Sequence, residues 1–265
     1  MALHRTILTH GGAGSDPKHS DGTETAAAAG MKIMENEGSS LDAVVQSVII
    51  LEDDPRFNAG LGSRLRVDGT TIELDASCMT SDGNFGSVIC VEGIQNPIEI
   101  ARGVLTHSHH IGLAGKGARI FADEHNISLK PLKQVPEDQN NDAPSCDTVG
   151  AVAFDGKTFA AALSTGGLKQ AAIGRVSDVP LPGCGLFCGP IGAVACTGDG
   201  EYIAGKILAK QVYDWIEQEM PPEMAVEKAI ALFEDSVDIG LLVLTKNEFF
   251  SNARRGMAQA HKHHP

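Results

Sequence analysis

The pattern of hydrophobic and polar positions at the start of the sequence predicts a strand and two helices. Residues 6–10 (TILTH) are typical of a short strand, which runs into the glycine turn HGGAG at 10–14. Residues 22–37 carry their apolar side chains on one side, as an amphipathic helix does, and Gly38 is expected to end this helix. A second helix is predicted to follow at 40–53.

Capping and breaking residues set the limits of this second helix. Ser39 or Ser40 suits the N-cap, because a serine hydroxyl accepts hydrogen bonds from first-turn amides. Pro55 stops the helix, and the glycines of FNAGLGS at 57–63 interrupt both the helical and the strand period. The latter segment is therefore expected to be irregular.

Hairpin signals lie further along the sequence. The first joins RLRV (64–67) to TTIELDASC (70–78) through Asp68–Gly69, a pair that favours tight turns. The second joins two small, apolar segments within 148–165 through Asp155–Gly156, and these are expected to be buried on both faces. Between the two hairpins the pattern predicts a strand near 86–92, a short helix opened by Asn96–Pro97 and a helix over 111–125.

Residues 129–147 differ from both of their neighbours. They contain prolines at 131, 136 and 144, many Asp, Asn and Gln residues, and little apolar periodicity. Such a segment is typical of an exposed linker. A buried strand beginning with Thr148 is predicted directly after it.

The C-terminal part completes the expected fold. AVACTGDGE at 193–201 indicates a strand, a turn and a helix start, followed by helices over 201–219 and 222–235. GLLVLTK at 240–246 is expected to close the sheet. Strands and helices come in blocks rather than in regular alternation, so the predicted class is α+β, arranged as a four-layer αββα sandwich in one domain over 1–265. A two-layer α+β fold is the rival.

The net charge of the protein limits its partners. It has 21 Lys and Arg against 34 Asp and Glu, a net charge of −13, and such a surface repels nucleic-acid phosphates and anionic lipids. Neither nucleic acid nor a membrane is therefore an expected partner. No stretch approaches the about 18 apolar residues of a membrane span, and the start MALHRTILTHGG is too polar for a signal peptide. A cytoplasmic location is expected.

Cysteine and histidine spacing gives no metal or disulfide signal. The six cysteines have no CxxC spacing, so neither a disulfide framework nor a zinc ribbon is expected. They are Cys78, Cys90, Cys146, Cys184, Cys188 and Cys196. Two groups of histidines are expected to lie on the solvated surface, His107, His109 and His110, and His261, His263 and His264.

Several common catalytic motifs are missing from the sequence. GLAGKG at 112–117 lacks the leading glycine and the Ser or Thr of a P-loop, and Gly60–Leu61–Gly62 lacks the third glycine of a dinucleotide fingerprint. HGGAG is like the oxyanion segment of esterases, but the sequence has no GxSxG elbow. The sequence therefore predicts neither a phosphate-binding loop nor a serine hydrolase of the esterase type.

Thr148 is the residue whose context points to chemistry. A threonine at the start of a strand is most often only a good β-former. Its hydroxyl becomes a nucleophile when a base lies beside it, and a free α-amino group on the same residue can be that base. The unperturbed pKa of such an amine, about 7.7–8.0, suits proton transfer at neutral pH. Cutting the polypeptide between Asp147 and Thr148 would create this amine at the end of a rigid strand.

Nine short motifs follow one another over nearly the whole sequence. They are HGGAG (10–14), LDAV (41–44), PRFNAGLGS (55–63), ELDASCM (73–79), NP (96–97), DTVGAVAFD (147–155), STGG (164–167), GRVSD (174–178) and CTGDGE (196–201). Each alone is weak, but their order resembles the N-terminal nucleophile (Ntn) hydrolases of the plant-type L-asparaginase and isoaspartyl peptidase family, which are related to glycosylasparaginase.

The resemblance implies an inactive precursor that cleaves itself between Asp147 and Thr148. Residues 1–147 would then form an α-chain that includes the linker, and 148–265 a β-chain that starts with the nucleophile. The resemblance also implies that Thr165 hydrogen-bonds the nucleophile and that Asn58 lies near its amine. Two further residues, Thr197 and Gly198, would form the oxyanion hole.

The resemblance assigns substrate contacts as well. Arg175 would bind the α-carboxylate of the substrate bidentately, and Asp178 and Gly200 would hold its α-amino group. Taken alone, Arg175 and Asp178 could equally be a surface ion pair, and Asn58 a turn residue. The family's sodium loop corresponds to backbone carbonyls of Leu51, Glu52, Phe57, Ala59 and Leu61.

The sequence departs from the family pattern at a few positions. Asp147 and Ser177 stand where glycine is usual, and residues 170–172 (QAA) are less polar than usual. These differences affect substrate choice more than the class of reaction. The expected function is hydrolysis of L-asparagine and β-aspartyl (isoaspartyl) peptides, with no cofactor beyond a structural Na⁺, by a homodimer of αβ units. Alternatives are glycosylasparaginase-like hydrolysis of GlcNAc–Asn, a sequence-specific threonine endopeptidase, and an unprocessed, non-catalytic binder of small amino acids.

Overall fold

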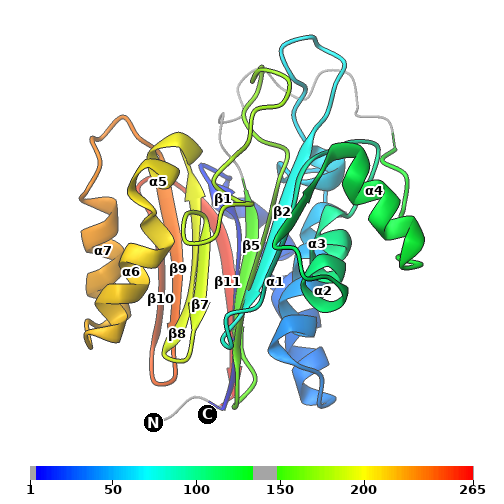
Figure 1. Cartoon of the computed structure of the whole chain (residues 1–265). Coiled ribbons are helices and arrows are strands. Elements are labelled where there is room, and N and C mark those ends of the chain that lie inside the picture. The colour runs from blue at the N-terminus through cyan, green and yellow to red at the C-terminus, as the bar shows by residue number, and fades with distance from the viewer. Residues whose placement is uncertain (1–3, 134–147, 265) are drawn as a thin grey trace.

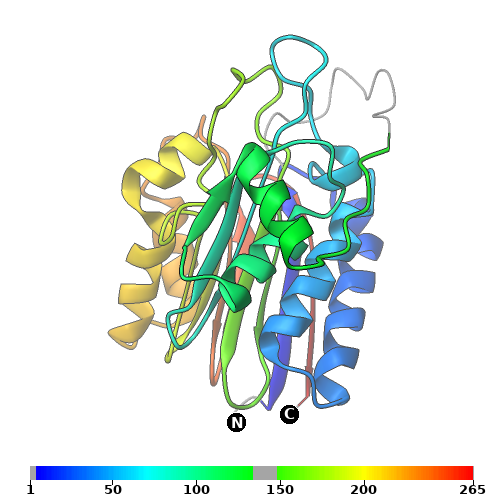
Figure 2. The same ribbon diagram turned by 45° about the vertical axis from the view of Figure 1, so that its right-hand side comes forward.

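Two β-sheets pack face to face between two layers of helices (Figure 1). The computed structural model describes residues 4–133 and 148–264. Figure 2, turned by 45°, shows the same layers from the side of the N-terminal helices. The four-layer αββα arrangement expected from the sequence is confirmed, and the two-layer rival is wrong.

The larger sheet has seven strands, and Thr148 directly precedes one of its interior strands. In sequence order its strands are β1 (Arg5–Ala13), β2 (Leu74–Thr80), β3 (Phe85–Val91), β4 (Gly112–Ala114), β5 (Val149–Phe154), β6 (Phe159–Thr165) and β11 (Met257–His264). They lie in the order β11-β1-β5-β6-β2-β3-β4, antiparallel except for the pair β3 and β4. The hairpin of β5 and β6 is therefore inserted between β1 and β2.

The smaller sheet is formed by C-terminal residues alone. Its strands are β7 (Leu186–Gly189), β8 (Gly192–Gly198), β9 (Ile239–Thr245) and β10 (Phe249–Ala253), in the order β10-β9-β8-β7. All its neighbours are antiparallel. The two sheets face each other through β5, β6, β8 and β9 among other strands.

Helices cover the outer face of each sheet. The larger sheet carries α1 (Ser20–Glu35), α2 (Ser40–Glu52), α3 (Pro97–His107) and α4 (Gly115–Glu124). The smaller sheet carries α5 (Gly200–Lys206), α6 (Leu208–Glu217) and α7 (Pro222–Ile230). Two short 3-10 helices, η1 (Pro17–His19) and η2 (Gly60–Gly62), lie in the loops.

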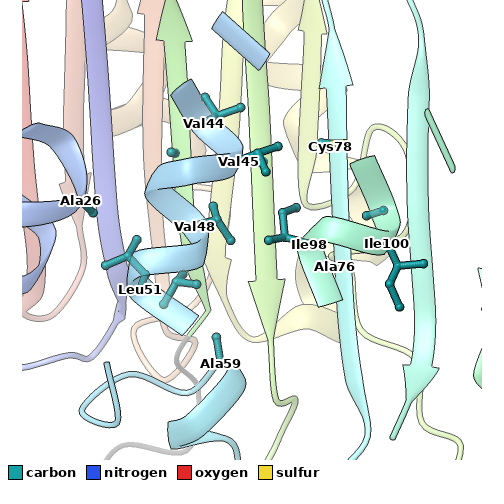
Figure 3. Packing of buried hydrophobic residues seen from close by; sticks show 14 of the residues in the cluster. Ala26, Val44, Val45, Val48, Leu51, Ala59, Ala76, Cys78, Ile98 and Ile100 are labelled. Atoms are coloured by element: carbon teal, nitrogen blue, oxygen red, sulfur yellow. The ribbon is translucent and has the colours of Figure 1, made fainter. Parts of the chain in front are cut away.

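Three hydrophobic layers hold these elements together. Figure 3 shows the first, where Val44 and Val48 of α2 and Ile98 of α3 pack on the larger sheet. The second fills the space between the sheets, and the third lies between the smaller sheet and α6 and α7. Burying one such aliphatic side chain contributes about 1.5–3 kcal/mol relative to leaving it exposed.

The start of α2 shows why the local prediction succeeded. The Ser39 hydroxyl accepts a hydrogen bond from Asp42 N at 3.1 Å, and the Asp42 carboxylate accepts one from Ser39 N at 3.3 Å. This reciprocal capping box satisfies amides that the first helical turn leaves unpaired. Ser39, rather than Ser40, is therefore the cap.

Several predicted elements differ from the structure. The helix expected over 201–219 is two helices, because Ile207 adopts the left-handed conformation with φ 50°. Residues 240–246 do not close the sheet, since β10 and β11 follow. The helix expected over 111–125 begins at Gly115 after the short strand β4, and that expected over 222–235 ends at Ile230.

The first predicted hairpin is also wrong, although its turn is present. Asp68 accepts hydrogen bonds from the backbone N–H groups of Thr70 and Thr71, so the turn is held by its own side chain. The flanking residues form no strands, and β2 begins only at Leu74. β2 instead pairs with β3 and β6.

The remaining surface and cysteine predictions can be placed. All six histidines named above are exposed. The five cysteines within the described residues are free, and Cys146 lies outside them, as does most of the predicted linker. None of the helices in residues 4–133 and 148–264 combines the length and hydropathy that crossing a membrane requires.

Candidate active site

Thr148 and Thr165 lie side by side at one end of the β5–β6 hairpin. Thr148 directly precedes β5 and Thr165 ends β6, and the pairing of Val149 with Ser164 sets their register. Thr148 Oγ1 donates a hydrogen bond to Thr165 Oγ1 at 3.2 Å, and both residues are buried. The Thr165 hydroxyl also accepts a hydrogen bond from Gly167 N at 3.0 Å. The contact expected between the two hydroxyls is present.

A small pocket lies over these two threonines. Its cavity volume is about 10 Å³, which is room for roughly one water molecule. It is lined by Thr148, Thr165, Gly167, Leu168, Arg175, Ser177, Asp178, Gly198 and Gly200. The fold therefore gathers six of the predicted site residues in one place. Asn58 and Thr197 are not among the lining residues, and Asp147 lies outside the described residues.

Arg175 lines this pocket and already binds a carboxylate, that of Glu201. Its Nε and Nη2 donate to the two carboxylate oxygens of Glu201 at 2.8 and 2.7 Å. The Arg175 side chain is 14% exposed, whereas that of Glu201 is 59% exposed. A paired, planar contact of this kind is how a guanidinium recognises carboxylates in general. The ion-pair partner of Arg175 is thus Glu201 rather than Asp178.

Asp178 is a buried carboxyl group beside that arginine. Burial raises its pKa to about 7, and the opposing effect of Arg175 is smaller. Its Oδ2 accepts no hydrogen bond from any of the described residues. A Cβ on Gly200 would lie 2.6 Å from Asp178 Oδ1, so a larger residue there would displace this carboxyl group. A carboxylate with an unused oxygen in a tight pocket can accept a hydrogen bond from an ammonium group.

The turn between β8 and α5 brings a backbone segment to the pocket. Gly198 has φ 130°, and a Cβ there would lie 2.1 Å from the carbonyl oxygen of Asp238, so no larger residue fits. Gly198 therefore presents only its backbone to the pocket. The hydroxyl of Thr197 accepts a hydrogen bond from Ala13 N at 3.0 Å, which ties the end of β8 to the end of β1.

Asn58 braces the turn that follows Thr165. Its Nδ2 donates to the carbonyl of Gly167 at 2.7 Å, and its own carbonyl accepts the N–H of Gly166 at 2.9 Å. Its Oδ1 accepts the N–H of Arg64 at 3.1 Å. Asn58 thus holds the turn at 166–167 through hydrogen bonds. It is 1% exposed, so it is not an ordinary exposed turn residue.

Sequence reasoning missed two residues close to the site. His10 of β1 is fully buried, and burial lowers its pKa to about 3, against a smaller opposing effect of the Thr148 backbone. Its ring is therefore neutral, and it lies so near β5 that a Cβ on Gly150 would be 2.5 Å from Nε2. Glu201 is the other missed residue, although it ends the CTGDGE motif. Both residues belong to motifs quoted above, HGGAG and CTGDGE. Nothing in the spacing of these motifs indicated which residues His10 or Glu201 would contact.

The segment from the end of α2 to η2 carries the carbonyls of the predicted sodium site. It folds back on itself, since a Cβ on Gly60 would lie 2.3 Å from the carbonyl oxygen of Glu52. The carbonyls of Leu51, Phe57 and Ala59 accept N–H groups from within the segment. A carbonyl oxygen has a second lone pair, so these hydrogen bonds leave each of the three carbonyls able to ligate a hard cation as well.

Comparisons with known proteins agree with one another. A family model described as asparaginase matches residues 3–142 and 131–260. An isoaspartyl peptidase/L-asparaginase of Danio rerio is 37% identical, over 88% of this sequence and 82% of the relative. A plant-type L-asparaginase of Pyrococcus horikoshii is 34% identical, over 96% and 95%. The isoaspartyl peptidase/L-asparaginase of Mus musculus is 36% identical, over 90% and 81%.

Proposed function

This protein belongs to the asparaginase family, and on that premise we propose that it hydrolyses the side-chain amide of L-asparagine and of β-aspartyl (isoaspartyl) peptides. One observation carries the proposal beyond family membership. The Thr148 hydroxyl is hydrogen-bonded to Thr165 in a pocket that also holds a guanidinium and a buried carboxyl, which suits a small zwitterionic substrate.

The first step in this proposal is self-cleavage. The Thr148 hydroxyl attacks the carbonyl carbon of Asp147, the peptide C–N bond breaks, and the resulting ester is hydrolysed by water. The product is a polypeptide that starts at Thr148 and has a free α-amino group. That amine is the base that the hydroxyl otherwise lacks.

The amine and the hydroxyl then act together on the substrate. The amine takes the hydroxyl proton as Thr148 Oγ1 attacks the amide carbonyl carbon of the substrate side chain. The oxyanion that forms accepts hydrogen bonds from the Thr197–Gly198 segment, and the same proton is delivered to the departing ammonia or amino acid. Water hydrolyses the remaining β-aspartyl ester and restores Thr148. Thr165 orients the nucleophile, and Asn58 keeps the turn after Thr165 in place.

The α-carboxylate and the α-amino group of the substrate each bind to a side chain of opposite charge. Arg175 binds the α-carboxylate, in competition with Glu201, and Asp178 with Gly200 binds the α-amino group. A Na⁺ ion held by the carbonyls of residues 51–61 would stiffen the loop that carries Asn58. Assembly into a homodimer of αβ units is part of the same proposal, and light scattering would test it.

Intact mass measurement tests the proposal first. Purified protein should separate on a denaturing gel into two fragments, the lighter one starting at Thr148. The same sample should release ammonia from L-asparagine and aspartate from a β-aspartyl dipeptide. GlcNAc–Asn should be tested in parallel, because faster turnover of GlcNAc–Asn than of L-asparagine would favour the glycosylasparaginase-like alternative.

Two substitutions of Thr148 serve as a matched pair. Thr148→Ser keeps a hydroxyl and should show slow self-cleavage and reduced turnover. Thr148→Ala should show neither. Normal turnover by the alanine variant would overturn the role of Thr148. Wild-type protein that stays intact, binds L-asparagine and never turns it over would instead support a non-catalytic binder.

A further inference from the structure

Alternate residues at the start of β2 point their side chains toward one neighbouring segment. Leu74 and Ala76 are buried in the layer between the larger sheet and its helices. Side chains alternate along an extended segment, so Glu73, Asp75 and Ser77 face the opposite side. All three are buried polar residues, between 0% and 4% exposed.

Each of these three side chains bonds to the backbone of residues 174–179. Glu73 Oε2 accepts the N–H of Gly174 at 2.8 Å. Asp75 Oδ2 accepts both the N–H and the hydroxyl of Ser177, at 2.9 and 2.6 Å.

Ser77 makes the third contact, its Oγ donating to the carbonyl of Val179 at 2.5 Å. The three contacts thus follow the same order in both segments. Between them lie the two residues assigned to the α-carboxylate and the α-amino group of the substrate. Arg175 lies between the first and second contacts, and Asp178 between the second and third.

Charge is balanced at the first contact by a buried cation. The Arg66 side chain is 1% exposed, and its Nε donates to Glu73 Oε2 at 3.1 Å. Asp75 is held on its other side, where Oδ1 accepts the N–H of Cys90 at 2.9 Å. Buried carboxylates with several hydrogen-bond donors form rigid connections, because breaking any one bond leaves a buried polar group unpaired.

We infer that Glu73, Asp75 and Ser77 are positioning residues that set the affinity of this site for α-amino acid substrates. None of the three lines the pocket over Thr148 and Thr165. They fix the backbone that carries Arg175 and Asp178, and so the distance between the groups that bind the α-carboxylate and the α-amino group. This inference rests on the proposed function.

Substitution of Asp75 gives the sharpest test. An asparagine has one carbonyl oxygen, so it can serve Cys90 or Ser177 but must turn its own N–H₂ toward the other. In Asp75→Asn, KM for L-asparagine should rise about tenfold or more, while kcat stays within about threefold of wild type. Self-cleavage, which needs no α-carboxylate, should proceed at the wild-type rate.

Glu73 offers a pair of variants that separates positioning from charge. Glu73→Gln can keep an oxygen at the Oε2 position and so retain the contact with Gly174, although it leaves Arg66 uncompensated. Glu73→Ala removes the contact. We expect a lower melting temperature in both variants but a clear rise in KM only in the alanine variant. Ser77→Ala, the mildest change, should raise KM by about threefold and keep the protein folded.

Asp155→Asn is the matched control. Asp155 also holds backbone N–H groups, those of Ser40, Lys157 and Thr158, but at the far end of the β5–β6 hairpin. Its substitution should lower the melting temperature and leave KM unchanged. The inference is overturned if folded, self-cleaved Asp75→Asn and Ser77→Ala proteins keep the wild-type KM. Wild-type protein without amidase activity would instead refute the proposed function itself.

Discussion

If Asp178 binds the substrate ammonium as proposed, we expect substrate binding to depend on pH near neutrality. Burial raises the pKa of its carboxyl to about 7. Below that pH the group is protonated and no longer attracts the substrate ammonium, so KM for L-asparagine should rise as the pH falls, by about tenfold per unit well below the pKa. Steady-state kinetics between about pH 8 and about pH 5.5 would show this limb.

A variant without the titrating group checks the assignment. Asp178→Asn should have a high KM that stays level over the same pH range. A wild-type KM that is unchanged from neutral to mildly acidic pH would contradict the role given to Asp178.

Glu201 accepts hydrogen bonds from Nε and Nη2 of Arg175, and we expect it to compete there with a substrate carboxylate. Its removal should therefore favour substrate, and we expect Glu201→Gln to lower KM for L-asparagine by about two- to fivefold, the scale of a partly exposed ion pair. Initial-rate measurements test this, with Glu227→Gln on the exposed face of α7 as the control. A higher KM in Glu201→Gln would show that the glutamate orients Arg175 rather than competing for it.

At the scale of elements, the junction of α5 and α6 is strained. Ile207 has φ 50° and ψ 50°, a conformation that β-branched residues rarely adopt, and the residue is 54% exposed. Ile207→Gly should therefore raise the free energy of unfolding by about 1 kcal/mol. Denaturant titration measures the change, and Ile207→Val, which keeps the branched Cβ, should show none. A less stable glycine variant would mean that the contacts of Ile207 outweigh its strain.

Elements with a regular spacing of hydrophobic residues or a clear turn or cap signal were predictable from the sequence, whereas elements defined by tertiary contacts were not. The apolar hairpin around Asp155–Gly156 and the capped α2 follow from local chemistry alone. The break at Ile207 has no local signal, because apolar residues continue at helical spacing on both sides. β11 ends in four exposed residues, so its sequence does not show the alternating hydrophobic pattern of a strand. Its strand conformation is recognised by its pairing with β1.

The same division applies to the site. The contact between Thr148 and Thr165 could be expected from motifs at the two ends of one hairpin. The bond from Arg175 to Glu201 joins segments 26 residues apart, and those from Asp75 to Ser177 join segments 102 apart. No spacing rule spans such separations. The sequence predicts a strand that includes ELDAS, but it does not indicate which segment the polar side chains of this strand contact.

At the scale of the whole molecule, the two predicted fragments interlock. β5 and β6 come from the C-terminal fragment and lie between β1 and β2 of the N-terminal one, while β11 covers the other edge of β1. We expect the cleaved fragments to elute together in gel filtration and to separate only in concentrated denaturant, because separation would break the sheet in its interior. Fragments that separate in native buffer would contradict this topology.

The pairing of β1 with β11 brings Arg5 opposite His264, so the first and last strands run alongside each other. A short loop could therefore join them, and the polypeptide could be reopened in front of Thr148, giving a circular permutant. Its translation would start Met-Thr, and cells remove an initiator methionine that precedes a small residue. Such a permutant should have the free α-amino group of Thr148 as soon as its initiator methionine is removed. It should hydrolyse asparagine without self-cleavage, even when Asp147 is deleted.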